Sequence, residues 1–346
     1  MARTKELKGA PRLAPMMVRA VATAAGRGGA VPELEVVRRG VSVDPDALAA
    51  YDQVCGFTLR DSLPATYIHV LTFPLQVALF ADRAYPYPLA GSVHLANRIT
   101  QYRPVRVGED MRLSVQAEPA RTHKRGATVD FVGAAYVGEE LVWSGRSTYL
   151  HRGQKVDNAD PADPADNAGR VGESDNAGRV GESDNDNAGR VGESDNDNAG
   201  RVGESDNDNA GRVGEPPRAS RIETIETTDP IDGPGARWRL PSDLGRRYAR
   251  VSGDVNPIHM SRLSAKALGF PRTIAHGMWS AARMLATVEN RVPDAYDFDI
   301  SFRKPVLLPS TVRCISHPSG LAGWDLTLRG DRQALIHAVA SVNGRT

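Results

Sequence analysis

Two stretches of nearly continuous apolar residues predict two buried helices, one in each half of the chain. The first covers residues 75–81 and the second covers residues 278–286. Apolar side chains cover most of the surface of each segment, which is typical of a helix buried on nearly all sides. After each helix come segments in which apolar and polar residues alternate, as in strands with one buried face. The chain therefore repeats one unit, a buried helix followed by strands.

The predicted strands follow the two helices in a matching order. They cover residues 111–117, 127–137 and 141–150 in the first half, and residues 311–317, 323–329 and 334–343 in the second. Before them, residues 99–108 and 300–309 each form a strand that runs into a turn. One buried helix followed by antiparallel strands favours an α+β fold, in which a curved sheet wraps around the helix. Two such units can join into one continuous sheet.

A compositional break separates the two units. Between residues 157 and 217 the unit Ala-Gly-Arg-Val-Gly-Glu-Ser-Asp-Asn recurs in tandem. Each repeat of 9 or 11 residues holds a single valine, too little apolar surface to offset the entropy lost on ordering, so we expect a disordered linker. A calcium-binding β-roll is the alternative, but the Gly-Asp pattern that it needs is missing. The expected organisation is a leader (1–40), a first unit (41–156), the linker (157–217) and a second unit (218–346).

The charge balance and the two cysteines argue against several classes of protein. With 43 basic and 42 acidic residues the net charge is +1, which gives no reason to expect nucleic acid or an anionic membrane as a partner. The two cysteines, Cys55 and Cys314, have no metal-ligand spacing, so we expect neither a disulfide framework nor a metal, and a cytoplasmic location fits. The basic, alanine-rich residues 16–25 predict a short helix or a loose leader, with a transit peptide as the alternative. No stretch reaches the roughly 18 apolar residues of a membrane span.

Candidate chemistry is concentrated in one short segment of the second half. Asp254, Asn256 and His259 lie within six residues, and Gly253 and Pro257 allow a tight, non-repetitive turn there. The turn brings an acid, an amide and a base close together, and a neighbouring acid and base are what general acid–base catalysis needs. Asn256 can orient the acid or the water without titrating. The structural alternative is an Asx-turn that caps a helix beginning near Pro257.

The segment Tyr248 to His259, together with His276-Gly277-Met278 before the second helix, resembles the MaoC-type hydratase family. This family includes the (R)-specific enoyl-CoA hydratases, or hydratase 2 enzymes. The resemblance covers roughly residues 221–346, and the first half resembles only the family's non-catalytic unit. It implies a double hot-dog fold, a substrate thioester of coenzyme A or of acyl carrier protein, no cofactor, and Asp254 and His259 as the catalytic pair. The family's usual Pro-Gly-Asp after the strand motif is Leu308-Pro309-Ser310 here, a departure that concerns the local turn.

Gly277 is the candidate oxyanion donor. A glycine at a helix N-terminus lets a thioester approach an unpaired backbone N–H at the positive end of the helix dipole. Aligning the two halves places Pro74 opposite Gly277, where we expect it in the first turn of the first helix. Proline has no N–H, and no motif like that of Asp254 precedes it. We therefore expect one active site per chain, with the first half completing the sheet and holding the acyl chain.

Weaker candidates remain, and three functions stay open. Arg303 and Lys304 can meet substrate phosphates, although Arg103 at the matching position favours a solvated strand edge. We expect His276 to be a helix-start contact rather than a ligand. The favoured function is a lyase that adds water to trans-2-enoyl thioesters to give (R)-3-hydroxyacyl thioesters, or runs the reverse dehydration. A hot-dog thioesterase and a non-catalytic acyl-binding or scaffold module are the alternatives, and a chain of two such units can be a monomeric pseudodimer or form a homodimer.

Overall fold

The computed structural model describes residues 3–9, 13, 16, 28–87, 89, 92–156, 229–332 and 335–345. The described parts of residues 1–161 and 225–346 belong to one compact unit. The tandem repeat predicted to be a linker, residues 157–217, lies outside the described residues, as does most of the segment 16–25. Among the described helices, none has the length and apolar character needed to cross a membrane.

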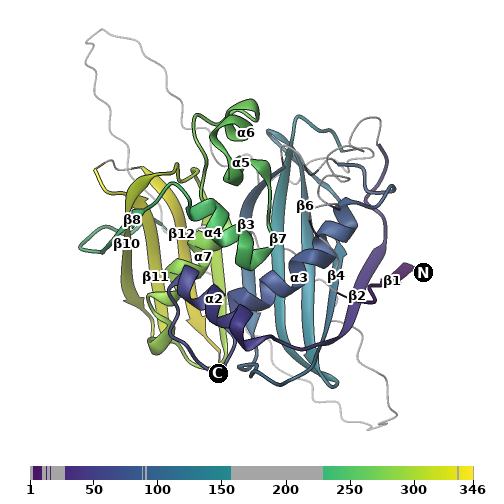
Figure 1. Ribbon diagram of the computed structural model, residues 1–346, viewed down its shortest axis with the longest axis horizontal. Coiled ribbons are helices and arrows are strands. Elements are labelled where there is room, and N and C mark those ends of the chain that lie inside the picture. The colour runs from purple at the N-terminus through teal and green to yellow at the C-terminus, as the bar shows by residue number, and fades with distance from the viewer. Residues whose placement is uncertain are drawn as a thin grey trace, which may run out of the picture. The chain divides into compact units, whose positions relative to one another are not determined.

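One large sheet is formed by strands from both halves (Figure 1). The first half contributes β1 (Arg3–Glu6), β2 (Leu34–Val41), β3 (Ser92–Gln101), β4 (Met111–Ala117), β5 (Arg121–His123), β6 (Gly126–Val137) and β7 (Glu140–Arg152). The second half contributes β8 (Ala236–Leu240), β9 (Tyr296–Phe302), β10 (Ser310–Ser319), β11 (Gly323–Gly330) and β12 (Ile336–Gly344). Their order is β1-β2-β4-β6-β7-β3-β9-β12-β11-β10-β8, with β5 paired to β6. Every pairing is antiparallel except that of β1 with β2.

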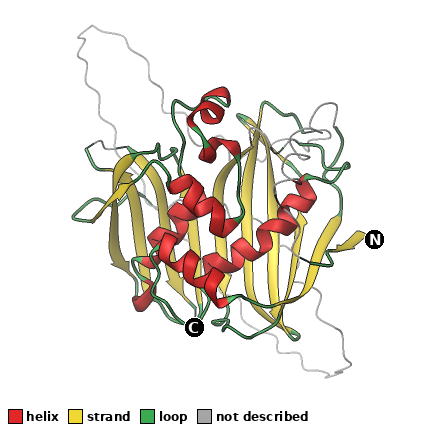
Figure 2. Cartoon of the chain, in the orientation of Figure 1, coloured by secondary structure: helices red, strands yellow, loops and turns green. Residues whose placement is uncertain are grey.

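The helices cover one face of this sheet (Figure 2). They are α2 (Pro45–Cys55), α3 (Ala65–Phe80), α4 (Leu244–Ser252), α5 (Pro257–Met260), α6 (Arg262–Ala267), α7 (Gly277–Ala286) and the 3₁₀ turn η2 (Glu289–Arg291). Fourteen of the sixteen residues of α3 are buried, as are seven of the ten of α7. Each half therefore packs its strands against one long buried helix, and these helices fill the core.

The two halves meet at β3 and β9, which pair antiparallel over six residues from Ala96–Ser301 to Gln101–Tyr296. Across this junction Arg98 donates to Asp299 through Nε at 2.6 Å and through Nη2 at 3.1 Å. The expected α+β architecture of two sheet-and-helix units joined through one sheet, the double hot-dog fold, is confirmed.

The first helix corrects the sequence prediction. It begins at Ala65, not near Pro74, and Pro74 lies inside it. The residues before Pro74 include Thr66, His69 and Thr72, whose polar side chains break the apolar pattern although all three are buried. Local hydrogen bonds satisfy two of them, since Thr66 accepts from the Tyr51 hydroxyl at 3.0 Å and Thr72 donates to the His69 carbonyl at 2.8 Å. Pro74 is therefore the tenth residue of its helix and not a first-turn residue, whereas Gly277 is the first residue of α7.

The sheet also starts earlier than the expected first unit. Strand β1 and all but the last residue of β2 fall within residues 1–40, the range assigned to a leader. β1 pairs with β2, and β2 pairs with β4. Residues of β2 such as Leu34 and Val36 are buried in the core. The sequence prediction relied on the basic, alanine-rich residues in this range and missed the strand that follows them, in which apolar and polar residues do not alternate regularly.

Candidate active site

A cavity of about 880 Å³ lies where the two halves meet. The second half contributes Asp254, His259 and Gly277 to its wall, and the first half contributes His94 and Tyr149. Most of the remaining wall is apolar, from residues such as Val70, Phe73, Leu150, Ile274 and Met278. A mostly apolar cavity with a few polar groups gathered at one place is the usual form of a small-molecule site.

The turn between α4 and α5 sets the direction of the acidic side chain. Gly253 ends α4 in the left-handed region at φ 73°, a conformation that glycine adopts without strain. Asp254 Oδ1 then accepts a hydrogen bond from the Asn256 amide at 3.1 Å. Asn256 in turn caps α5 by accepting from the Ile258 amide at 3.4 Å. The Asx-turn considered as the structural alternative is present, and the same turn orients the Asp254 carboxylate beside the cavity.

His259 is buried and held in one tautomer. Its Nδ1–H donates to the Ile274 carbonyl at 2.8 Å, so Nε2 of the neutral ring is left as an acceptor. Burial and then the neighbouring His276 lower the pKa of His259 to about 3, against a smaller opposing effect of Asp254. Burial raises the pKa of Asp254, which His259 partly offsets. The pair thus consists of a neutral imidazole and a carboxyl whose negative charge is disfavoured.

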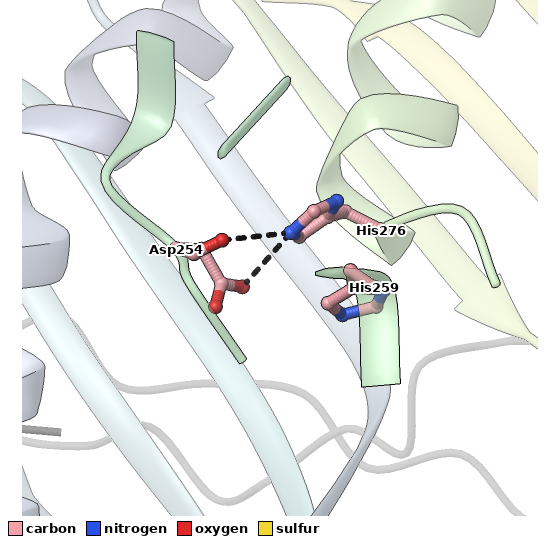
Figure 3. A group of neighbouring side chains, drawn as sticks. All are labelled: Asp254, His259 and His276. Atoms are coloured by element: carbon pink, nitrogen blue, oxygen red, sulfur yellow. Dashed lines mark hydrogen bonds and ion pairs between the residues drawn. The ribbon is translucent and has the colours of Figure 1, made fainter. Parts of the chain in front are cut away.

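His276 links the two members of this pair (Figure 3). It is the N-cap residue of α7, and its Nε2–H donates to the Asp254 backbone carbonyl at 3.0 Å. The same nitrogen lies 3.8 Å from Asp254 Oδ2, and the ring stacks on His259 with centroids 3.6 Å apart. Burial lowers the pKa of His276 to about 4. His276 is therefore a helix-start contact, as expected. It also contacts both members of the pair, a role that the sequence indicated only through its position directly before Gly277.

Gly277 places a backbone amide at the cavity wall. It is the first residue of α7, so its N–H has no acceptor within the helix. A Cβ added at this position would lie 3.2 Å from the Phe302 ring, so the site has little room for a side chain. Asn256 and Gly277 line the same cavity as Asp254 and His259. The four candidate site residues from the sequence therefore surround one space.

Arg303 and Lys304 follow β9 directly, and both are exposed while lining the cavity. Two exposed arginines of the first half, Arg125 and Arg152, line it as well. Apart from histidines, the charged residues in the lining are these four cations and Asp254. The openings of the cavity therefore favour an anionic ligand.

A metal ion would find suitable donor atoms here. One ligand atom each of Asp254, His259 and His276 lies within 4.8 Å of the others, and carboxylate and imidazole both bind divalent transition metals. However, His276 Nε2 and His259 Nδ1 already donate to carbonyls. Without a tautomer change, each neutral ring keeps one acceptor nitrogen for a metal, Nε2 of His259 and Nδ1 of His276.

Comparisons with a family model and with known sequences all indicate a dehydratase family. Residues 208–334 match a family model described as the MaoC like domain. The chain is 32% identical over 314 residues to 3-hydroxyacyl-thioester dehydratase X of Mycobacterium tuberculosis, covering 91% of this chain and 90% of that protein. A shorter match joins it to the fatty acid synthase subunit beta of Saccharomyces cerevisiae, 54% identical over 48 residues, which are 14% of this chain and 2% of that one.

Solved structures agree with the sequence matches. A crystal structure of HtdX from M. tuberculosis matches with a TM-score of 0.64 and 31% identity, covering 90% of this chain and 100% of that chain. The MaoC-like dehydratase of Phytophthora capsici matches with a TM-score of 0.58 and 14% identity, covering 94% and 97%, which supports the fold alone.

Proposed function

We propose, since this chain belongs to the MaoC-like dehydratases, that it is a hydro-lyase of fatty-acid metabolism that interconverts trans-2-enoyl and (R)-3-hydroxyacyl thioesters. The observation that carries the proposal is that Asp254, His259 and Gly277 line one mostly apolar cavity, with Asp254 and His259 close together. An acid–base pair, an oxyanion donor and space for an acyl chain are the parts that this reaction needs.

In hydration, the proposed pair acts on one water molecule. His259 Nε2 is the acceptor available for a water proton, because Nδ1 is occupied by Ile274. The water oxygen bonds to C3 of the enoyl group, and the pair returns one proton to C2. Asp254 and His259 hold the same number of protons before and after the cycle, so no other proton source is needed. Because coupled groups titrate as a unit, we assign the proton to the pair rather than to either residue.

Negative charge develops on the thioester oxygen while C2 awaits its proton. The Gly277 amide, at the positive end of α7, is the donor we assign to that oxygen. His276 acts as a positioning residue, because it fixes the Asp254 backbone and stacks on His259. Asn256 positions Asp254 through its backbone amide.

The substrate we propose is an acyl thioester with an anionic handle. Coenzyme A and the phosphopantetheine of a carrier protein both carry phosphate, which suits Arg303 and Lys304 at the cavity opening. His94 and Tyr149, with the apolar wall of the first half, would surround the acyl chain.

The test is the change in ultraviolet absorbance of a trans-2-enoyl-CoA as its double bond is hydrated, with chiral analysis of the product. Asp254→Asn and His259→Ala should each lower kcat by about 10²–10⁴-fold, the usual contribution of general acid–base groups. Asp46→Asn and His317→Ala make the same changes at exposed positions and should leave kcat unaltered. A loss below about tenfold in both active-site variants, an (S)-product, or release of free thiol would contradict the proposal.

A further inference from the structure

Exposed leucines stand beside the cavity on helix α6 and the turn after it. Leu263 is 82% exposed and Leu268 is 42% exposed, and they are two of only five large apolar side chains that are strongly exposed in the described residues. Leu268 also lines the cavity, as does Phe270 two residues later. A side chain that is in contact with both cavity and solvent marks an opening, so the cavity opens next to α6.

Positive charges surround these leucines. Arg262 and Lys266 are exposed on α6. Arg246 of α4 lies beside them, because its Nη1 donates to the Met260 carbonyl at the end of α5, at 3.3 Å. None of the three forms an ion pair with an acidic side chain within the described residues, whereas arginines elsewhere in the fold commonly do. We call Arg246, Arg262, Leu263, Lys266 and Leu268 the α6 rim.

The sequence around the rim keeps this charge uncompensated. Between residues 241 and 275 only Asp243 and Asp254 carry carboxylates, and Asp254 faces the cavity. The whole chain has nearly equal numbers of acidic and basic residues, so the local excess is a feature of this surface. Unpaired cations around exposed leucines complement a partner that is acidic and has a small apolar contact.

We propose that the α6 rim is the docking surface for an acidic acyl carrier protein, which delivers its thioester through the adjacent opening. The inference rests on the proposed function and names the partner of that site. Free coenzyme A can meet its phosphate contacts at Arg303 and Lys304, but it has no protein surface with which to cover Leu263. The exposure of Leu263 is therefore what favours a carrier protein over the free cofactor thioester.

The test compares one trans-2-enoyl group on three handles: an acidic acyl carrier protein, coenzyme A and uncharged pantetheine. Leu263→Ser should raise KM for the carrier-protein substrate and so lower its kcat/KM about tenfold. The kcat/KM values for the coenzyme A and pantetheine substrates should stay unchanged. The double variant Arg262→Glu and Lys266→Glu should lower kcat/KM for the carrier-protein substrate further and remove the dependence of this value on salt concentration. Arg239→Glu, an exposed charge reversal on β8, serves as the matched control.

The pantetheine substrate separates the possible results. Unchanged turnover of enoyl-pantetheine shows that a variant retains its fold and chemistry. Equal losses of kcat/KM with all three substrates, or no loss with the carrier-protein substrate, would overturn the docking surface and leave the proposed enzyme function standing. Turnover of the coenzyme A substrate by the wild type with none of the carrier-protein substrate would do the same. If the wild type hydrates none of the three, the proposed function itself fails.

Discussion

Gly245 supports His259 from the neighbouring helix. A Cβ at this position would lie 2.3 Å from the His259 carbonyl oxygen and 3.3 Å from its Cβ, closer than packed atoms approach. Glycine in a helix normally costs about 1 kcal/mol relative to alanine, so the residue is expected here for close packing. The contact lets α4 and α5 lie together and keeps the imidazole within reach of Asp254.

Gly245→Ala should therefore displace His259. We expect kcat to fall at least about tenfold, because His259 is a proposed catalytic group and a small displacement of such a group lowers the rate strongly. Overpacking should lower the free energy of unfolding by about 1–3 kcal/mol. Helix propensity alone predicts the opposite, because alanine favours a helix more than glycine does. Steady-state kinetics and urea denaturation measure the two effects. A variant that is more stable than the wild type and fully active would contradict the role of this contact.

Buried neutral histidines predict an acid-sensitive fold. Burial lowers the pKa of His69 to about 4, and the usual value in an unfolded chain is about 6.5. The unfolded state then binds more protons between these values, so the free energy of unfolding falls as the pH drops from about 6.5 towards 4. Replacing His69 by leucine removes this proton uptake. Relative to wild type, His69→Leu should become progressively more stable as pH is lowered from 7 to 5, measured by urea denaturation.

The exposed His317 gives the matched control for that experiment. His317→Leu should follow the wild-type pH dependence. A difference between His69→Leu and wild type that stays constant with pH would mean that His69 does not resist protonation in the folded state.

At the scale of elements, α3 carries a proline where a helix normally excludes one. Pro74 lacks the N–H that would bond to the Val70 carbonyl, and an interior proline costs about 3 kcal/mol in a helix. The helix persists because its other residues are nearly all buried against the sheet. Pro74→Ala should raise the free energy of unfolding by about 1–3 kcal/mol, measured by urea denaturation. Unchanged or lower stability would show that the packing of α3 depends on the proline bend.

The elements also show what the sequence could predict. Strands such as β4 and helix α7 follow simple alternation or an apolar run, so their bounds were predicted to within a residue or two. Residues 65–73 of α3 were missed, because the buried polar side chains of Thr66 and His69 interrupt the apolar pattern. Thr66 is satisfied by the Tyr51 hydroxyl, a contact that a sequence does not display. Asp254 and His259 could be predicted as neighbours since one turn joins them. The wall formed by His94 and Tyr149 could not, because it depends on the register of β3 with β7.

In the whole molecule, the junction of β3 and β9 holds the second half, with Asp254 and His259, against the first half, with His94 and Tyr149. Asp299 is 9% exposed at its side chain and Arg98 is its bidentate partner, itself 40% exposed. Burial raises the pKa of Asp299 even with Arg98 in place. Because both halves line one cavity, weakening this junction should affect the site as well as the fold.

Arg98→Met should lower the free energy of unfolding by about 1–3 kcal/mol, less than a fully buried pair because Arg98 is partly solvated. Without the guanidinium the pKa of Asp299 rises further, so its charged form opposes folding more strongly above its unfolded pKa of about 4. The loss of stability should therefore grow as the pH rises from 5 to 8, measured by urea denaturation. Adding Asp299→Asn removes the charge and should abolish that pH dependence. A loss equal at both pH values would mean that the pair acts through packing and not through charge.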